Sequence, residues 1–313
     1  MKKRFNLVYM GTPDFAVPAL PALLEAGHCI TLVVTQPDRP SGRGRKLQAP
    51  PVKTAALESG IPVFQPESIK TNEVALRLKE LNPDFLVVAA FGRILSEDLL
   101  AIPGYGAVNI HASLLPRYRG PAPIQWAIIN GEKETGVTTM LMDRGLDTGD
   151  ILLSEKTAIS EKDTSSTLHD RLALMGASLV VETLAKMGEG HIRPIPQNHD
   201  QATYAPLLTK KDGRIDWKKS SRQLDAFIRG MTPWPGAYTF EGENRLKILS
   251  AKPVFQSSSA SPGTVLPGFS DELRIATQDG ALIVLKIQGA SGKRLSIRDF
   301  LRGHQIPPGT QFE

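Results

Sequence analysis

Short apolar runs alternate with amphipathic segments through the first hundred residues, and this alternation limits the possible folds more than any other feature. Residues 6–10, 30–35 and 84–90 are each almost wholly apolar, which is typical of buried strands. Residues 14–26 and 71–81 have helical periodicity. Apolar strands that alternate with helices predict a doubly wound, mostly parallel α/β sheet, a fold that binds ligands at the carboxyl ends of its strands.

The chain has 313 residues, which is long enough for two domains. A helix expected at 165–186 would close a first domain at 1–189, and residues 190–208, which have no apolar period, suit a linker. In residues 209–313, short alternating segments near 237–240, 246–251, 273–277 and 281–287 are separated by Gly, Pro, Asn and Ser clusters. This second pattern predicts a small C-terminal β-barrel that resembles an OB fold.

Several classes of protein are disfavoured by what the sequence lacks. No apolar run reaches the ~18 to 20 residues needed to cross a bilayer, so we expect a cytoplasmic protein without a membrane partner. A single cysteine, Cys29, excludes an intrachain disulfide, and the histidines lack ligand spacing, so no metal is expected. Met10-Gly11-Thr12-Pro13 holds one glycine of a dinucleotide fingerprint, and residues 289–293 are too short for a phosphate loop. Neither a nicotinamide cofactor nor nucleotide hydrolysis is expected.

Basic residues concentrate in the last third of the chain. Lysine and arginine outnumber acidic residues by 16 to 10 in residues 205–313, whereas residues 1–204 hold 21 against 22. Such an asymmetry can be merely a solvated surface, but a basic domain beside a neutral one favours a polyanionic partner such as nucleic acid.

The most informative segment runs from Val108 to Pro121. In a strand that begins near Ala107, Asn109 and His111 are two residues apart, so their side chains share a face. An amide can stabilise a developing oxyanion and an imidazole can transfer a proton, which are the components of acyl transfer. On these two residues alone, a structural role for the histidine is the favoured interpretation.

Three carboxylates follow a strand expected at 136–141, in a glycine-bearing loop of the kind that holds functional groups. Asp143 and Asp150 are interpreted as turn or cap residues. Asp147 is the candidate for chemistry.

The ordered set Asn109-x-His111, Ser113-Leu114-Leu115-Pro116 and Asp147 resembles the formyltransferases that use 10-formyltetrahydrofolate. The likeness covers nearly the whole chain and is closest to the branch that formylates methionyl-tRNA. It implies that Asn109, His111 and Asp147 are catalytic, that 10-formyltetrahydrofolate is the co-substrate, and that no metal takes part. It also implies folate contacts from Ser113, Leu114, Leu115 and Pro116, and a backbone cup for the pterin ring at Phe91, Gly92, Arg93, Ile94 and Leu95.

The basic segment 37–47 resembles an insertion that enters the tRNA acceptor stem in this branch. The resemblance implies tRNA contacts from Arg39, Arg43, Arg45 and Lys46, with Arg43 at the position of an important arginine. Basic residues without apolar anchors can contact phosphates, although by itself such a loop is better explained as solvated surface. The barrel would bind backbone farther along the tRNA.

The resemblance therefore implies a monomeric enzyme that formylates the α-amino group of methionyl initiator tRNA, giving N-formylmethionyl-tRNA for translation initiation. Whether His111 or Asp147 accepts the amine proton stays open. Glycinamide ribonucleotide and amino-sugar formyltransferases share the catalytic pattern, but the first should lack a second domain and the second need not carry a basic loop. A formyltetrahydrofolate hydrolase, or an RNA-binding module on an inactive scaffold, is a further alternative.

Overall fold

A computed structural model describes residues 3–41, 46–255 and 259–313. These residues form two compact units. The first unit comprises Met1–Pro123, Glu134–Ala158 and His169–Pro206, and the second comprises Ile124–Lys133, Ile159–Leu168 and Leu207–Glu313. Residues 190–206, which the sequence predicts as most of a linker, lie within the first unit.

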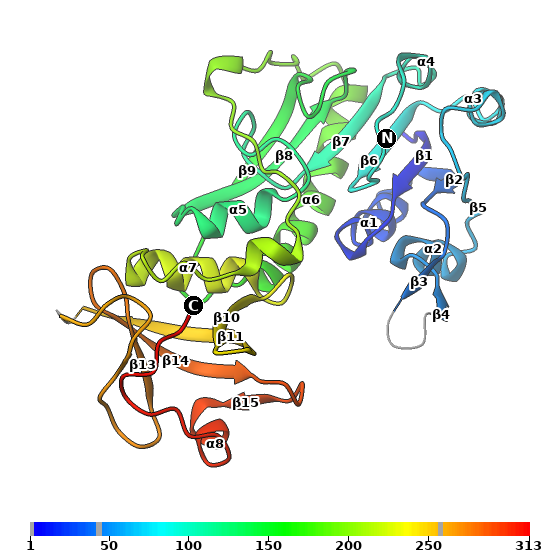
Figure 1. Cartoon of the computed structure of the whole chain (residues 1–313). Coiled ribbons are helices and arrows are strands. Elements are labelled where there is room, and N and C mark those ends of the chain that lie inside the picture. The colour runs from blue at the N-terminus through cyan, green and yellow to red at the C-terminus, as the bar shows by residue number, and fades with distance from the viewer. Residues whose placement is uncertain (1–2, 42–45, 256–258) are drawn as a thin grey trace. The chain divides into compact units, whose positions relative to one another are not determined.

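A seven-stranded sheet forms the centre of the first unit, in the order β5-β2-β1-β6-β7-β8-β9 (Figure 1). The first five strands in this order are parallel, whereas β8 and β9 run antiparallel to their neighbours. The prediction of a mostly parallel α/β sheet is confirmed. The strands are β1 (Asn6–Gly11), β2 (Cys29–Val34), β5 (Val63–Phe64), β6 (Phe85–Ala89), β7 (Ala107–His111), β8 (Glu134–Leu141) and β9 (Ile151–Ala158).

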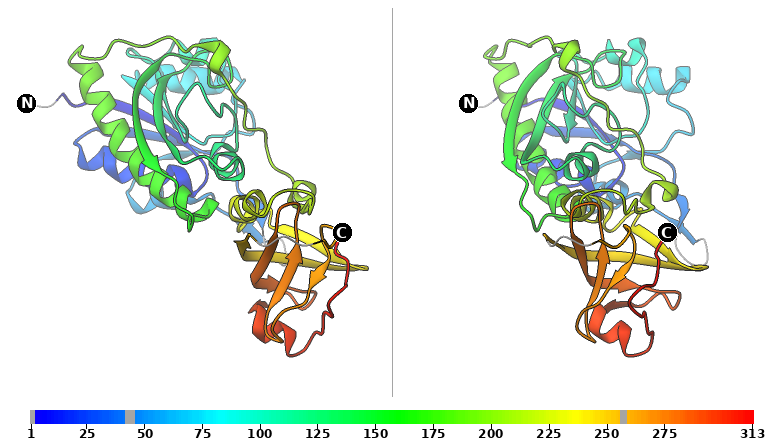
Figure 2. Two further views of the ribbon diagram at one scale, coloured as in Figure 1. Left: turned by 90° about the vertical axis from the view of Figure 1, so that its left-hand side faces the viewer. Right: turned by 60° about the vertical axis from the view of Figure 1, so that its left-hand side comes forward.

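Helices cover both faces of this sheet because its central strands are apolar on both sides. On one face, α3 (Asn72–Glu80) and α4 (Glu97–Leu100) pack on Val8, Met10 and Val88. On the other face lies α6 (Ser165–Gly188), which follows the sheet closely (Figure 2). Gly176 permits this approach, since a Cβ there would be 2.6 Å from Cγ2 of Ile110 in β7.

The helix predicted at 14–26 is divided in two. A short 3₁₀ helix, η1 (Asp14–Ala16), is followed by α1 (Ala19–Glu25), with Pro18 at the N-cap of α1. Proline lacks an amide hydrogen and fits only the first turn of a helix, so a continuous helix could not pass through Pro18. A further helix of the first unit is α2 (Pro51–Glu58).

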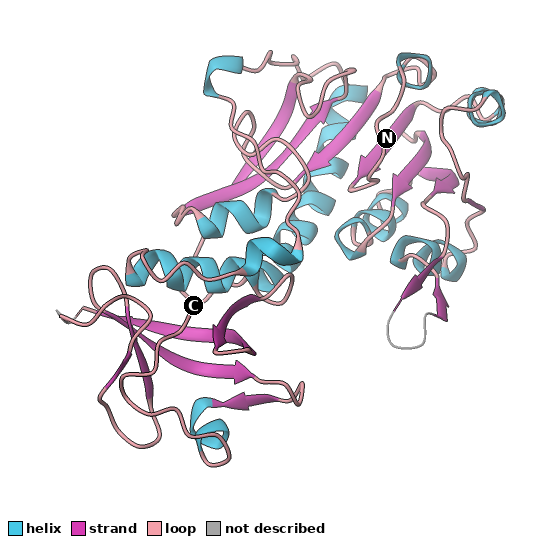
Figure 3. Ribbon diagram, in the orientation of Figure 1, coloured by secondary structure: helices cyan, strands magenta, loops and turns pink. Residues whose placement is uncertain are grey.

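Antiparallel strands in the order β10-β11-β14-β13-β12, with β15 beside β14, make a half-barrel sheet in the second unit (Figure 3). The last residues bridge its two edges: Val265 donates to the Thr310 carbonyl at 2.8 Å, and Phe240 and Glu313 exchange two bonds of 3.1 Å. The barrel prediction is therefore confirmed as a half-barrel. Its strands are β10 (Ala237–Glu241), β11 (Asn244–Val254), β12 (Val265–Leu266), β13 (Leu273–Ala276), β14 (Ala281–Gln288) and β15 (Arg294–Ser296).

The α-helices that the structure describes in the second unit include α5 (Pro123–Ile129), which belongs to it from Ile124 on, α7 (Ser221–Met231) and α8 (Ile297–Leu301). The helix α7 is absent from the sequence-based predictions, although Ser220 and Gln223 form a capping box at its start. Within the described part of the chain, no helix is both long and apolar enough to cross a membrane.

Candidate active site

The first pair of candidate side chains lies on β7, a fully buried strand between β6 and β8. Asn109 and His111 share one face of this strand, as the strand period predicts. Their exposed fractions are only 9% and 6%. A buried amide and a buried imidazole need hydrogen-bond partners, and the loops after β7 and β8 supply them.

The loop after β7 turns back onto His111. The Nε2 atom of His111 lies 2.9 Å from the carbonyl oxygen of Tyr118. Because a carbonyl only accepts hydrogen bonds, Nε2 carries the hydrogen and Nδ1 faces the other side. Thr138 of β8 holds the start of this loop, since its hydroxyl donates to the Ser113 carbonyl at 2.7 Å and accepts from the Leu115 amide at 3.2 Å.

Asp147 reaches the same place from the loop between β8 and β9. Its φ of 54° lies in the left-handed region, which aspartate adopts more readily than most residues. Its carboxylate accepts from the Gly120 amide at 2.7 Å, and it lies 3.5 Å from Nδ2 of Asn109 and 3.6 Å from Nδ1 of His111. The structure thus brings together all three residues of the predicted catalytic group.

This arrangement surrounds one point with an amide donor, an imidazole nitrogen and a carboxylate. The amide and the imidazole can stabilise negative charge on a carbonyl oxygen, and the carboxylate or the imidazole can take up a proton. These abilities suit the attack of a nucleophile on a carbonyl carbon.

The other two aspartates of this loop take part in its local structure. Asp143 accepts from the Gly145 amide at 3.0 Å and from the Thr148 hydroxyl at 2.7 Å, so it stabilises its own turn. The Asp150 carbonyl accepts from the Leu141 amide at 2.9 Å, which closes the loop at the end of β8. Among the residues that the structure describes, no group of three His, Cys, Asp or Glu side chains gathers as a metal site would require.

The candidate folate segment after β6 presents mainly backbone. Phe91 and Leu95 are buried in the core against α3 and α4, so their side chains are already occupied. Gly92 has a φ of 77°, and a Cβ there would be 2.6 Å from Nε2 of Gln36. That Gln36 amide donates to the Phe91 carbonyl at 2.9 Å. Arg93 is half-buried and Ile94 is exposed.

The second candidate folate segment follows His111 directly. Ser113 and Leu115 are buried, whereas Leu114 and Pro116 are half-buried. Thr138 binds the Ser113 carbonyl and the Leu115 amide of this segment.

The basic segment begins and ends in a small antiparallel hairpin of β3 (Arg39–Ser41) and β4 (Lys46–Gln48). Arg39 and Lys46 are exposed. Arg43 and Arg45 lie outside the described residues.

The base of the hairpin is anchored through Asp38. Lys53 donates to both carboxylate oxygens of Asp38 at 2.8 Å, and Gln65 donates to one of them at 2.7 Å. These hydrogen bonds, that from Lys53 foremost, hold the pKa of Asp38 below its ordinary value.

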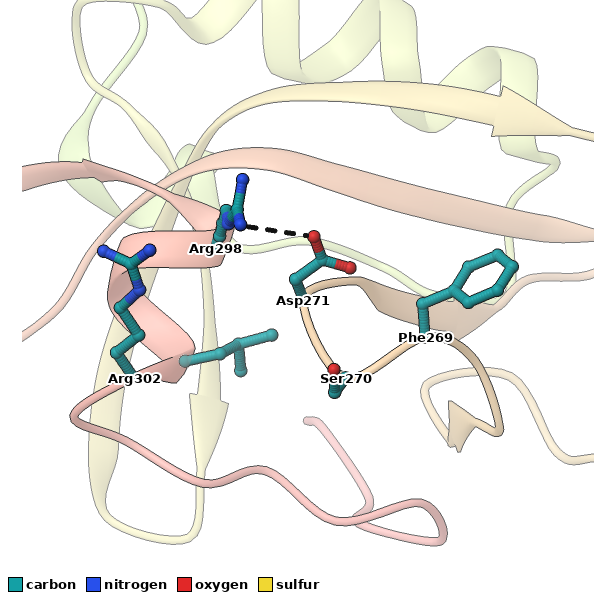
Figure 4. Close-up of a pocket in the computed structure, with 6 residues that line it drawn as sticks. Phe269, Ser270, Asp271, Arg298 and Arg302 are labelled. Carbon is teal, nitrogen blue, oxygen red and sulfur yellow. Dashed lines mark ion pairs between the residues drawn. The ribbon is translucent and has the colours of Figure 1, made fainter.

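A cavity of about 410 Å³ lies in the second unit, between α8 and the loop before β13. Figure 4 shows Arg298 on α8, Arg302 directly after the last residue of α8, and Phe269 and Asp271 on that loop. Nε of Arg298 lies 3.9 Å from a carboxylate oxygen of Asp271. The lining thus combines two arginines, one acidic residue and an exposed aromatic ring.

Two polar residues near the catalytic group had no role assigned from sequence. Arg119 lies inside the motif that the sequence singled out, and Gln197 lies in the expected linker. Both residues are buried, at 1% and 6% exposure, and Gln197 contacts the backbone of the Asp147 loop. A charged residue next to a catalytic motif was the only available signal for Arg119.

Two family models of known proteins match this chain. The family model described as Formyl transferase matches residues 3–184, and the model described as Formyl transferase, C-terminal domain, matches residues 207–305. Fold and site together therefore define the class as a formyl transferase.

Comparison with individual relatives identifies the branch of this family. A methionyl-tRNA formyltransferase of Caldanaerobacter subterraneus is 53% identical over 97% of this chain and 99% of its own length. Another, from Pelotomaculum thermopropionicum, is 51% identical over 97% of both chains. The chain belongs to the formyl transferase family and, within it, to the methionyl-tRNA formyltransferase enzymes.

Solved structures of lower identity share the fold. An N-formyltransferase from Helicobacter canadensis, solved with folinic acid and dTDP-3-aminofucose, has a TM-score of 0.65 at 21% identity and covers 89% of this chain and 97% of its own. HypX from Aquifex aeolicus, solved with tetrahydrofolic acid, has a TM-score of 0.64 at 16% identity, over 98% of this chain and 51% of its own.

Proposed function

We propose that this enzyme transfers the formyl group of 10-formyltetrahydrofolate to the α-amino group of methionyl initiator tRNA. The observation that carries the proposal is the convergence of Asn109, His111 and Asp147 at the buried end of β7. It occurs in a chain about half identical to methionyl-tRNA formyltransferases over nearly its whole length.

The reaction begins when the methionine amine attacks the formyl carbon, which forms a new C–N bond and a charged oxygen. Asn109 Nδ2 is positioned to donate to that oxygen. The Nε2 hydrogen of His111 is used by Tyr118, so Nδ1 is the ring atom that serves the reaction. The bond from the formyl carbon to the folate N10 then breaks, the amine loses a proton and N10 gains one.

Asp147 is the third member of this catalytic group, and its carboxylate lies 3.6 Å from Nδ1 of His111. Its carboxylate orients the imidazole and stabilises the positive charge that His111 acquires when it takes up the amine proton. The Gly120 amide, 2.7 Å from the carboxylate, keeps Asp147 in place. The products are N-formylmethionyl-tRNA and tetrahydrofolate.

The folate is proposed to lie between the segments 91–95 and 113–116. Gly92 supports this placement, because it is exposed and has no side chain, while Gln36 fills the space into which a Cβ would point, so the first segment presents backbone. The two half-buried residues Leu114 and Pro116 offer apolar contact from the second segment.

Incubation of the enzyme with 10-formyltetrahydrofolate and methionyl initiator tRNA tests the proposal. We expect N-formylmethionine on the tRNA and one tetrahydrofolate per formyl group transferred. Methionyl-tRNA with an acetylated amine is the control and should give neither product. Equal consumption of the folate without charged tRNA would instead identify a hydrolase, and formylation of glycinamide ribonucleotide or an amino sugar alone would identify a small acceptor.

Arginines in two places are proposed to contact tRNA phosphates: Arg43 in the basic loop, and Arg298 with Arg302 beside the cavity of the second unit. Each phosphate that the enzyme no longer binds should reduce the slope of log affinity against log salt by about one. We expect Arg43→Ala and the double variant R298A/R302A to raise KM for tRNA and lower this slope, with little change in folate binding.

Arg274→Ala is the matched control, since its side chain is 25% exposed and Glu272 binds the guanidinium at 2.9 and 3.0 Å. The side chains of Arg298 and Arg302 are 67% and 68% exposed, although they pair with Asp271 and Asp299. The control should keep the slope of the unmodified enzyme. An unchanged slope in both test variants would contradict the assigned contacts, and an equal loss of folate binding would indicate that these residues only support the fold.

A further inference from the structure

The loop that carries Asp147 is tied to a segment far along the chain. The side-chain amide of Gln197 donates to the Asp147 carbonyl at 2.9 Å and to the Gly149 carbonyl at 2.7 Å. One NH2 group thus uses both hydrogens on two carbonyls of the same loop. Backbone held at both positions leaves Asp147 little freedom to rotate away from His111.

Arg119 decides which way this amide faces. Its Nε and one terminal nitrogen donate to Oε1 of Gln197 at 3.0 and 2.6 Å. A guanidinium only donates, so turning the amide over would set its NH2 against Arg119 and its oxygen against the two carbonyls. The amide therefore has one favourable orientation, and in it the NH2 group faces the Asp147 loop.

Arg119 itself is 1% exposed and has no carboxylate partner among the described residues. Its second side-chain partner, after Gln197, is Nδ1 of His199, at 3.2 Å. A guanidinium buried without a counter-charge costs desolvation energy, so a buried charge is weak evidence for a role in stability. Stability alone therefore does not account for an arginine here, whereas fixing an amide by a fork of donors does.

The same short segment also contacts the catalytic group directly. Tyr118 accepts from His111, and the Gly120 amide donates to the Asp147 carboxylate. Arg119, between them, controls the backbone of the Asp147 loop through Gln197. The backbone of Arg119 is also hydrogen-bonded on both sides. Its amide donates to the Thr203 carbonyl at 2.8 Å, and its carbonyl accepts from the Ala205 amide at 2.7 Å.

We propose that Arg119 and Gln197 are positioning residues for formyl transfer: together they hold the Asp147 loop so that its carboxylate stays against Asn109 and His111. This inference rests on the proposed catalytic role of Asp147. Neither residue is assigned contact with substrate.

Gln197→Glu is the sharpest test, because it keeps the shape and the acceptor for Arg119 but replaces the donor by an acceptor facing two carbonyls. We expect kcat to fall about 10²-fold, because a displacement of a catalytic group by about 1 Å can cause a loss of that size. KM for tRNA and for 10-formyltetrahydrofolate should be nearly unchanged. Gln201→Glu, the same change at an exposed site four residues on, should have no effect.

A double-mutant cycle with Asp147→Asn separates positioning from a general structural role. If Gln197 acts through Asp147, adding Gln197→Glu to Asp147→Asn should not reduce the residual turnover further. If Gln197 only supports the fold, the two losses should multiply, and that result would overturn the proposal. Normal kcat in Gln197→Glu, alongside a large loss in Asp147→Asn, would also overturn it and leave the proposed function intact.

Normal turnover in Asp147→Asn would reject the catalytic scheme itself, and the inference with it.

Should Gln197→Glu fold poorly, Arg119→Lys and Arg119→Met provide a second series. Lysine can donate once to Gln197 and methionine cannot donate at all, so kcat should fall less for lysine than for methionine. Equal losses per folded molecule would contradict the proposed role of the fork.

Discussion

Replacement of His111 by alanine is expected to lower turnover by about 10³-fold, within the range attributed to general acid–base catalysis. Nδ1 lies 3.6 Å from the Asp147 carboxylate at a buried end of β7, and alanine has no group that could take up the amine proton there. Binding of 10-formyltetrahydrofolate should change little, because the proposed folate segments contact the ligand independently of the imidazole. Single-turnover kinetics and equilibrium folate binding measure the two effects.

A second substitution separates chemistry from loop support. His111→Gln retains a donor that can reach the Tyr118 carbonyl, which the Nε2 atom of His111 contacts at 2.9 Å, but it lacks the nitrogen that faces Asp147. We expect it to fold normally and to be nearly as slow as His111→Ala. The exposed His191, which pairs with Glu189 at 3.1 Å, provides the control variant His191→Ala. Near-normal turnover in His111→Gln would show that the histidine is structural.

Gly149→Ala is expected to have the second largest effect, on stability as well as on turnover. A Cβ at this position would be 1.8 Å from the Leu141 carbonyl oxygen and 3.2 Å from the Asp143 amide nitrogen, and both are backbone atoms. The loop would have to leave the end of β8, which also removes the bond from Gln197 to Gly149. Overpacking of this kind costs about 1–3 kcal/mol, or several degrees in Tm.

Turnover of this variant should fall about 10²-fold because Asp147 moves with the loop. Thermal unfolding and initial rates at a temperature well below Tm measure the two losses separately. Gly104→Ala is the matched control, since a Cβ there would meet nothing within 4 Å and the residue has no positive φ. Unchanged rates in Gly149→Ala would mean that the loop can move without disturbing catalysis.

The fold near the site was largely predictable from local sequence. The strands expected at 6–10, 30–35 and 84–90 agree with β1, β2 and β6 to within a residue, because apolar runs bounded by turn residues define their own ends. The helix at 14–26 was wrong in the middle, where Pro18 interrupts it. The spacing of Asn109 and His111 correctly placed both on one face.

What sequence by itself determined about this protein is therefore the α/β order, a small C-terminal barrel-like domain and the family, because periodicity and an ordered motif lie along the chain. The tertiary structure alone decided how Asp147 meets His111 and why Gln197, in an expected linker, contacts the Asp147 loop. Gln197 binds backbone carbonyls, and every residue has one. Such a contact therefore leaves no complementary side chain in the sequence to reveal it, and only the folded chain brings the partners together.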